Sequence, residues 1–437
     1  MIAGKGIYDR LPVALQTVAV NWRSWRGFRV KYGGVFRERL AWLEANEKKS
    51  RDQLLEEQAR ALRSLLEYAC RHVPYYRRLN APPDDLKAWP ILEKATVVAN
   101  PKDFLSDEFS PSELMEIRTS GTTGTPLRVR FTAEYHQTEM AFRWRHKAWG
   151  GVPFLSRGAY VAGHPVVPSD QQRPPFWRWD AVEQRLLMSS YHLTEANLPY
   201  YVEALQRYRP DFVHGYPSSV YLVAREILRQ GGLPAGGWRP KAVFTASETL
   251  LDFQRAAIEQ AFGVKVFNWY GQTEFTVNIV EDAQGKLRQR TDYGVLELLE
   301  DGTMVGTGLN NRAMPLIRYR MGDRAVAGKD TDGFPVIERL EGRVEDYVRT
   351  PDGRMVGRLD HLFKDVQGVR EAQILQRRLD EIVCRIVRTD GYGPEQEAVV
   401  RAEARQRLGP QVTVRFEYVD RIERGPGGKF RFIVTEL

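Results

Sequence analysis

A loop rich in glycine and hydroxyl side chains is the first stretch of the chain whose residue types could do chemistry. The sequence RTSGTTGTPLRVR, residues 118–130, places four hydroxyls and two glycines in the six positions 119–124. Open backbone N–H groups and hydroxyl donors can surround an anion, and phosphate is the natural candidate. The phosphate loop of kinases and GTPases is excluded, because Pro126 and Leu127 stand where its spacing needs glycine and lysine. The alternating apolar residues of 127–131 predict a strand after the loop, which favours an ordered phosphate site over a flexible linker.

Further polar stretches carry residue types suited to a nucleotide. NWYGQTE, residues 268–274, follows a predicted strand and offers an aromatic plane, a glycine, a hydroxyl and a carboxylate. RYRMGD ends at Asp323, which is placed to accept hydrogen bonds from a ribose diol, and EGRVED, residues 341–346, follows it. GPGGKF presents Lys429 in a glycine-rich loop near the C-terminus. Each motif alone also fits a structural role, such as a turn aspartate, a core aromatic ring or a solvated lysine.

Composition limits the classes of protein that remain. A chain of 437 residues with 43% hydrophobic side chains is too long for one ordinary core, so at least two domains are expected. Cys70 and Cys384 are too far apart in the sequence for a disulfide framework or a cysteine-based zinc site, which favours a reducing cytoplasm. The seven histidines show no ligand spacing, so no structural metal is predicted. The net charge of +8 suits anionic ligands without indicating nucleic acid.

Neither a membrane-spanning segment nor a signal segment is predicted. No run of eighteen apolar residues exists, and residues 11–20 are too short and too polar for a convincing signal segment. The stretch 22–39, WRSWRGFRVKYGGVFRER, interleaves basic and aromatic side chains. Such a mixture can lie on an anionic membrane surface. The alternative, favoured by the interrupting glycines, is a helix that packs its aromatic side chains on the main domain and leaves its arginines in solvent.

Hydrophobic periodicity predicts alternating helices and strands. Helices are expected over residues 53–71, 218–230, with a serine N-cap, and 251–262, stopped by Gly263. Short apolar runs at 242–245, 264–269, 294–299 and 316–320 predict strands between or after them. The alternation favours an α/β sheet, whose binding residues lie on loops after strand ends.

A second, smaller unit is predicted after residue 343. A turn at 350–353 closes a hairpin, and strands at 372–377, 381–387 and 412–418 surround a helix at 394–408. The predicted division is therefore a large N-terminal α/β domain, residues 1–342 with a helical region at about 1–110, and a small α+β domain, residues 343–437.

Taken in order, these motifs resemble the adenylate-forming acyl/aryl-CoA ligase superfamily, and more closely its phenylacetate-CoA ligase-like branch. YACRHVPYYRRL (residues 68–79) and WPILEK (residues 89–94) are similar to that branch's helical N-terminal region. The opening YDRLPVALQTVAV, with its Arg/Trp tail, resembles the CapK subgroup, which is often associated with polysaccharide or surface-conjugate biosynthesis. The resemblance implies a large α/β adenylate-forming domain followed by a small mobile domain.

The resemblance also implies residue roles. The phosphates of ATP would be held by Ser120, Gly121, Thr122, Thr123, Gly124 and Thr125. The rest of the nucleotide would lie against Ala246, Ser247, Glu248, Asn268, Trp269, Tyr270, Gly271 and Gln272, with Tyr270 stacked on the adenine and with Asp323 and Arg343 on the ribose. The catalytic residues would be Lys429, on the substrate carboxylate and α-phosphate, Glu274, which would hold Mg²⁺, and Thr273.

An acyl pocket and a hinge complete the implied site. The pocket would be lined from residues 135–144 and 214–221, with Tyr135, His214, Gly215, Tyr216 and Pro217 as substrate-binding residues, although His214 fits a structural role equally well. Glu345 and Asp346 would form the hinge between the domains. Many relatives carry lysine after the proline of the phosphate loop. Here Leu127 stands there, so pyrophosphate must be handled by the hydroxyls, Arg128 or another residue.

The predicted function is an ATP-dependent carboxylic acid ligase that forms an acyl-AMP and then an acyl-CoA thioester. A carboxylate attacking an α-phosphate brings anions together, so the reaction needs cationic and hydroxyl donors and a divalent ion. Expected ligands are ATP, Mg²⁺, coenzyme A and an aryl or apolar acid, with no nucleic acid. Two alternatives remain: an adenylating enzyme that passes the acyl group to an amine or sugar, and a non-catalytic nucleotide-binding partner protein. The resemblance also allows a homodimer.

Overall fold

The chain folds around one large mixed sheet. The structure, a computed structural model, describes residues 5–119, 127–168, 171–328, 336–343, 347–352, 355–356, 359–363, 366–425 and 430–437. In this described part, twelve strands form the sheet in the order β11-β12-β13-β14-β10-β9-β8-β7-β6-β3-β5-β4. They are β3 (Gly158–Ala162), β4 (Trp177–Asp180), β5 (Arg185–Ser189), β6 (Phe212–Gly215), β7 (Ala242–Ala246), β8 (Val266–Gly271), β9 (Asn278–Glu281), β10 (Leu287–Gln289), β11 (Gly294–Leu298), β12 (Thr303–Gly308), β13 (Tyr319–Ala327) and β14 (Val336–Arg343). Strands β5, β3, β6, β7 and β8 pair in parallel, as the predicted α/β class requires.

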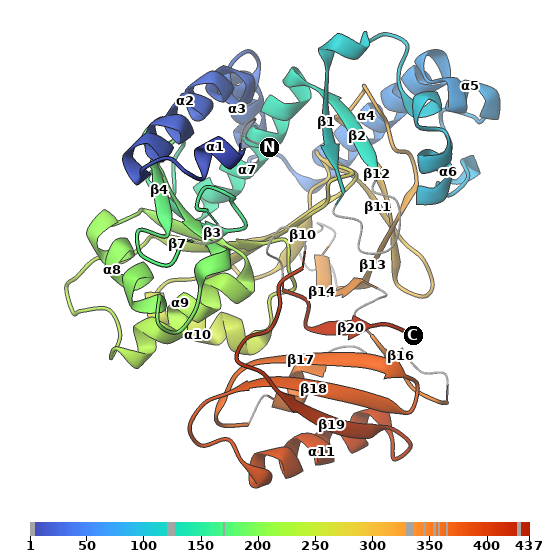
Figure 1. Cartoon of the computed structure of the whole chain (residues 1–437). Helices are drawn as coiled ribbons and strands as arrows, with labels where there is room; N and C mark the ends of the chain where they lie inside the picture. Colours follow the sequence, from blue (N-terminus) through green and yellow to red (C-terminus); the bar gives the residue numbers. More distant parts are fainter. Residues whose placement is uncertain are drawn as a thin grey trace.

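Helices cover both faces of the parallel strands (Figure 1). One face carries α8 (Leu198–Tyr208), α9 (Pro217–Arg229) and α10 (Asp252–Phe262), and the other carries α2 (Val13–Tyr32), α3 (Phe36–Asn46) and α7 (Ala133–Trp149). Because side chains alternate along a strand, Val213 and Val243 join the core with α9 and α10. Phe212 and Phe244 join the core with α3 and α7 on the opposite face. The next residue of the same parity in β6, His214, therefore faces α7.

Helix ends follow local rules, with one correction to the sequence prediction. Helix α10 ends at Gly263, whose φ of +69° provides the left-handed stop that the sequence predicted. Helix α9 begins one residue before the predicted start, at Pro217, with Tyr216 as its N-cap, so Ser218 is not the cap. Proline is favoured at the first helical position because its missing N–H would have no partner there.

The predicted strand at 316–320 is also corrected. Arg318 has a φ of +50°, which interrupts the extended backbone, and β13 begins only at Tyr319. Leu316 and Ile317 instead pack in a core with the N-terminal helices. The apolar run reflected burial in a loop, which sequence periodicity does not distinguish from a short buried strand.

The N-terminal region is helical, and a hairpin follows it. Its elements are α1 (Lys5–Tyr8), the helices α2 and α3 named above, α4 (Arg51–His72), α5 (Pro74–Leu79), α6 (Lys94–Ala99), β1 (Leu114–Arg118) and β2 (Arg128–Thr132). Strands β1 and β2 pair antiparallel on either side of the predicted phosphate loop. The Thr119 N–H donates to the Leu127 carbonyl at 2.9 Å, and the Leu127 N–H donates to Thr119 Oγ1 at 3.0 Å. These two bonds hold the ends of the loop together.

Helix α2 differs from the favoured sequence interpretation of its aromatic side chains. Tyr32 and Phe36 pack near Phe154, as expected for a helix docked on the main domain. Trp22 and Trp25, however, are 58% and 68% exposed. The expectation that all aromatic side chains of this stretch pack inward is therefore wrong for these two. Within the described residues, every helix is too short or too polar to span a bilayer.

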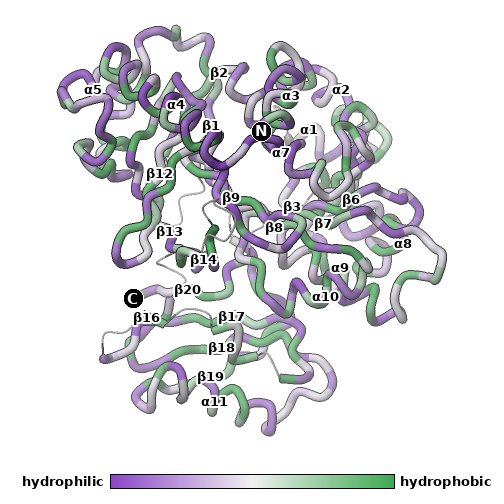
Figure 2. Tube along the Cα trace, turned by 180° about the vertical axis from the view of Figure 1, so that it is seen from behind, coloured by the Kyte–Doolittle hydropathy of each residue, from purple (hydrophilic) through white to green (hydrophobic). Residues whose placement is uncertain are grey.

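The C-terminal unit has a sheet and a core of its own. Its elements are the hairpin β15 (Val348–Arg349) and β16 (Met355–Val356), with β17 (Val369–Arg378), β18 (Glu381–Arg388), α11 (Pro394–Leu408), β19 (Thr413–Tyr418) and β20 (Ile433–Thr435). The larger sheet has the order β19-β18-β17-β20, and α11 packs on it through residues such as Val400 and Leu408. Figure 2 shows green, hydrophobic stretches along these strands. The predicted α+β architecture of this unit is confirmed.

Candidate active site

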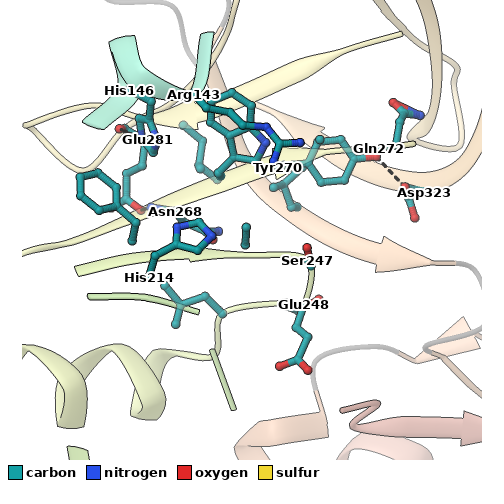
Figure 3. A pocket seen from close by; sticks show the side chains of 18 of the residues that line it. Arg143, His146, His214, Ser247, Glu248, Asn268, Tyr270, Gln272, Glu281 and Asp323 are labelled. Carbon is teal, nitrogen blue, oxygen red and sulfur yellow. Dashed lines mark hydrogen bonds between the residues drawn. The ribbon is translucent and has the colours of Figure 1, made fainter. Parts of the chain in front are cut away.

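A cavity of about 960 Å³ lies at the carboxyl ends of β6, β7 and β8. Open α/β sheets bind ligands at this edge, and the volume suits a nucleotide together with a small acid. The walls come from α2, α7, the strand ends, β13, β14 and the C-terminal unit, which contributes Gly425 and the four residues from Phe430 to Ile433. The cavity therefore joins the two parts of the chain. Figure 3 shows part of its lining.

Glu248 connects three elements at the mouth of the cavity. It follows Ser247, whose φ of +74° is a strained conformation of the kind that clusters at functional sites. Its carboxylate accepts hydrogen bonds from the N–H of Ser218, at the start of α9, at 3.1 Å and from the N–H of Phe430 at 2.5 Å. Burial raises the pKa of Glu248, and these donors oppose that rise. Because Phe430 directly follows Lys429, the bond attaches the C-terminal loop to the cavity.

Tyr270 and Asp323 meet across the cavity wall. The Tyr270 hydroxyl donates to Asp323 Oδ2 at 2.5 Å, which is the dashed contact in Figure 3. Asp323 lies in β13 directly opposite Arg343 in β14. The two residues expected at the ribose are thus cross-strand neighbours, and the aromatic ring expected at the adenine lies beside them.

Glu274 lies in the cavity lining between these groups and the N-terminal hairpin. The Tyr319 hydroxyl donates to Glu274 Oε1 at 3.2 Å. Gly271, Gln272 and Thr273 line the same wall. Groups of three or more metal ligands are absent from the described residues. A single carboxylate nevertheless fits Mg²⁺ in a phosphate site, because this ion usually takes one or two carboxylates together with phosphate oxygens and water.

Asn268 and Trp269 lie in the middle of β8, before its end at Gly271. Asn268 Oδ1 accepts from the Thr245 hydroxyl at 3.1 Å, and its N–H donates to Glu281 Oε2 at 3.1 Å. Trp269 lies with its ring 5.5 Å from that of His146 on α7. Both residues line the cavity, as does Ala246. The strand-end residues that the motifs indicated are therefore brought together.

We call the part of the cavity between α7, α2 and strands β3, β5 and β6 the inner pocket. One face of α7 contributes residues at helical spacing, and the other elements face it. The lining side chains are Lys31, Tyr32, His136, Glu139, Met140, Arg143, Trp144, Lys147, Tyr160, Glu183, Arg185 and His214. The sequence prediction covered His214 and α7 as far as Trp144. It missed the side chains from α2 and β5 and also Lys147, whose i, i+4 spacing from Arg143 was the available signal.

Four expected substrate-binding residues lie outside the lining of this cavity. Tyr135 is buried, with its hydroxyl 3.4 Å from that of Tyr293. Gly215, Tyr216 and Pro217 form the turn between β6 and α9, where a Cβ on Gly215 would stand 2.3 Å from the Val161 carbonyl oxygen. These positions support the pocket wall in this structure, and a direct role in substrate binding stays a prediction.

Some predicted site residues lie outside the described part of the chain. They are Ser120, Gly121, Thr122, Thr123, Gly124, Thr125, Glu345, Asp346 and Lys429, and the side chain of Arg343. Their described neighbours Thr119 and Phe430 both line the cavity.

The fold is that of the adenylate-forming enzymes. A solved 2-hydroxyisobutyryl-CoA ligase, in the postadenylation state with 2-HIB-AMP, superposes with a TM-score of 0.64 at 18% identity, covering 87% of this chain and 89% of that one. The score is 0.50 against the same enzyme in its thioesterification state.

Relatives in sequence indicate the branch of the adenylate-forming superfamily that this chain resembles. The CapK C-terminal domain profile matches residues 348–436. Protein CapK of Staphylococcus aureus is 28% identical over 347 residues, 75% of each chain, and the phenylacetate-coenzyme A ligase of Pseudomonas putida is 25% identical over 379 residues, 79% of each chain. The resemblance to the adenylate-forming superfamily, on its phenylacetate-CoA ligase-like and CapK-like branch, is confirmed. The expected enzyme class is an adenylate-forming ligase. The relatives and structural neighbours that are named as CoA ligases are enzymes of this class.

Proposed function

We propose that this protein is an ATP-dependent carboxylic acid ligase that forms an acyl adenylate and pyrophosphate and then transfers the acyl group to coenzyme A. One observation carries the proposal: Glu248, Tyr270, Asp323 and Glu274 line one cavity to which the loop beside Lys429 is attached. Four separate sequence motifs therefore converge on a single site. The CoA ligases among the relatives and structural neighbours support the same reaction.

In this proposal the strand ends bind the nucleoside. The ring of Tyr270 offers a stacking face for the base. The Asp323 carboxylate accepts a hydrogen bond from Tyr270, and its oxygens are of the type that accepts hydrogen bonds from ribose hydroxyls. The hairpin tip between β1 and β2 supplies hydroxyl and N–H donors to the phosphates.

In this proposal the reacting groups would lie between the nucleoside and the inner pocket. Glu274 would hold Mg²⁺, which neutralises phosphate charge when it is bound. Lys429 would donate to the substrate carboxylate and the α-phosphate as negative charge develops. The inner pocket would hold the rest of the acid and exclude water from the mixed anhydride.

A second candidate keeps the adenylate but uses an amine or a sugar hydroxyl as the acceptor. The CapK C-terminal match and the similarity to Protein CapK favour it. Both candidates share the first half-reaction, so they differ only in what consumes the acyl adenylate.

A panel of carboxylic acids, read by pyrophosphate release with and without coenzyme A, tests the proposal. Release with a suitable acid supports adenylation, and consumption of the CoA thiol identifies the acceptor. Release without thiol consumption favours the amine or sugar candidate. A panel without pyrophosphate release from any acid would favour the non-catalytic nucleotide-binding alternative.

The hydroxyl-rich loop gives the first mutational prediction. Combining Thr122→Ala with Thr123→Ala should weaken ATP binding roughly tenfold or more, because two hydrogen-bond donors to phosphate oxygens are lost. The two hydrogen bonds between Thr119 and Leu127 at the ends of the loop remain. Isothermal titration with ATP measures the change. Thr413→Ala, on exposed β19, is the matched control and should bind ATP normally. Unchanged affinity in the double variant would remove this loop from the site.

A further inference from the structure

Most charges of the inner pocket are paired within the protein. Lys31 Nζ lies 2.6 Å from Glu183 Oε1. Arg185 Nη2 lies 2.8 Å from the same oxygen and 2.7 Å from Asp180 Oδ2. Two cations therefore face two carboxylates, and this group is neutral as a whole.

A second pair lies on α7. Arg143 Nε donates to Glu139 Oε1 at 3.1 Å, and the Tyr293 hydroxyl donates to Glu139 Oε2 at 2.9 Å. The guanidinium remains half-exposed to the cavity, and Figure 3 shows it beside Tyr270. The Arg143–Glu139 pair is also neutral.

Lys147 is the cation that these pairs leave uncompensated. It is only 7% exposed, and among the described residues it makes no ion pair with a carboxylate. Its Nζ lies 5.1, 5.6 and 5.9 Å from the ring centres of Trp144, Phe212 and Phe244, which attract a cation without neutralising it. Burial, with the nearby charges of Arg143 and Arg185, lowers the pKa of Lys147 to about 7.

His214 adds an unsatisfied polar atom to the same place. Its Nδ1 is buried without a hydrogen-bond partner in the protein. Burial, followed by the charge of Lys147, lowers its pKa well below the ordinary value, so the ring is neutral and can carry its proton on either nitrogen. Buried polar atoms are normally hydrogen-bonded, so an orphaned atom in a cavity-lining residue indicates a missing partner group.

Position separates Lys147 from the reacting carboxylate. Phe212 and Phe244 each lie two residues before the cavity-lining His214 and Ala246. At a rise of about 3.3 Å per residue, the backbone of these two phenylalanines lies about 7 Å before the strand ends, where the predicted nucleotide residues gather, and Lys147 lies over their rings. It therefore faces the far end of a bound acid.

We propose that the inner pocket selects an acid that carries a second anionic group, such as a distal carboxylate, and that Lys147 and His214 bind this group. The inference rests on the proposed function and names the substrate class for it. The surrounding rings still accommodate an aryl frame, as the sequence suggested. A buried lysine with no carboxylate partner among the described residues adds a binding group for an anion at the far end of that frame, and such an anion would favour the protonated amine. The lysine gains most from that anion because a charged partner in a buried site is weakly screened.

Matched acids test the proposal. Phenylacetate is compared with 4-carboxyphenylacetate, and hexanoate with adipate, by pyrophosphate release at equal concentrations. The diacid of at least one pair should show a kcat/KM at least about tenfold higher. Monoacids used as well as or better than their diacids would overturn the inference and leave the ligase proposal standing. If every acid gives no pyrophosphate, the ligase proposal itself fails, and with it this inference.

Lys147→Met assigns the effect to one side chain. Methionine keeps the contacts with the aromatic rings and removes the charge, so the fold should persist with an unchanged or higher melting temperature. The kcat/KM for the diacid should fall about 10- to 100-fold, mainly through KM, while that for the monoacid stays within about threefold. Lys241→Met, on the exposed ion pair with Asp211, is the control. Equal losses for both acids would show that Lys147 is only structural.

Helix α2 carries a second, independent inference. The side chains of Leu15, Val18, Trp22 and Trp25 are 50%, 63%, 58% and 68% exposed, and their spacing of three, four and three residues places them on one face. Gln16, Val20 and Ser24 anchor the opposite face in the protein.

We call the exposed face formed by Leu15, Val18, Trp22 and Trp25 the stripe. The charge on α2 indicates what this stripe contacts. Arg23, Arg26 and Arg29 are exposed beside it, and the helix contains no acidic residue. We infer that the stripe docks on an anionic lipid surface, where tryptophan rings lie at the headgroup level and arginines meet phosphates.

Sedimentation with lipid vesicles tests this inference. The protein should bind vesicles of phosphatidylcholine with about 30% phosphatidylserine, should bind pure phosphatidylcholine more weakly, and should lose binding as salt rises. Trp22→Ala with Trp25→Ala should reduce binding at least about tenfold, because both rings leave the interface. Tyr200→Ala, an exposed aromatic side chain on α8, is the control. Equal weak binding to both vesicle types, or a dimer that the tryptophan variant dissolves, would overturn the inference.

Discussion

Lys429→Ala is expected to slow acyl-adenylate formation by roughly 10²- to 10³-fold, the scale seen when one donor to a developing charge is removed. The attacking carboxylate and the α-phosphate are both anionic, so a cation between them is worth more in the transition state than in the bound substrates. The bond between Phe430 and Glu248 brings the adjacent backbone to the cavity, within reach of this role. ATP–pyrophosphate exchange measures the first half-reaction directly.

The same variant supplies its own control. Acyl adenylate prepared chemically and added to the enzyme should pass to coenzyme A at a rate close to that of the parent, because Lys429 is needed only in the first step. A loss of less than about threefold in the rate of pyrophosphate exchange is far smaller than the loss expected when a charge donor is removed. This result would show that Lys429 does not take part in adenylate formation. Parallel loss of both half-reactions would indicate a damaged fold.

Glu345→Pro should leave adenylate formation near the parental rate and slow transfer to coenzyme A at least about a hundredfold. Lys429 must reach the α-phosphate in the first step, yet a thiol must later approach the same acyl carbon, so the small unit has to leave the first pose. Residues 345 and 346 stand between the end of β14 at Arg343 and the start of β15 at Val348. Proline fixes φ near about −65° and removes an N–H, which obstructs a rotation there.

Glu345→Ala is the matched control, because it removes the same carboxylate and leaves the backbone free to rotate. Both half-reactions of this control should remain near the parental rates in single-turnover measurements. If the two half-reactions of Glu345→Pro fall in parallel, the hinge assignment is wrong. If the alanine variant loses transfer as well, the carboxylate rather than the rotation is responsible.

Elements with local signals were predictable from the sequence. Helix α11 begins and ends at the predicted residues, Pro394 and Leu408, because proline at its start and glycine after its end mark both limits. Strand β7 was similarly marked by a continuous buried run. The start of β13 was missed because its limit depends on the positive φ of Arg318, which only tertiary contacts impose.

The residues that the motifs assign to a nucleotide could be expected to lie together, because they come as short motifs at strand ends, and the described ones line one cavity. The inner pocket was not, because its charged groups come from separate parts of the chain. Lys31 and Glu183 are 152 positions apart and meet only because α2 packs beside β4 and β5. The pattern of residues 22–39 marks Lys31 only as one of several basic residues, and no local pattern marks Glu183, so their pairing requires the folded structure.

In the proposed mechanism, the bond between Phe430 and Glu248 would also affect how the chain distributes between its two poses at rest. A hydrogen bond to a charged group stabilises by about 1.5–3 kcal/mol, which corresponds to a population ratio of roughly 10- to 150-fold. Glu248 stays anchored by the N–H of Ser218 when this bond breaks, so the acceptor remains in place for the loop to return. In the proposed two-pose mechanism this bond would therefore favour the pose described here, and each turnover would have to break it to reach the transfer pose.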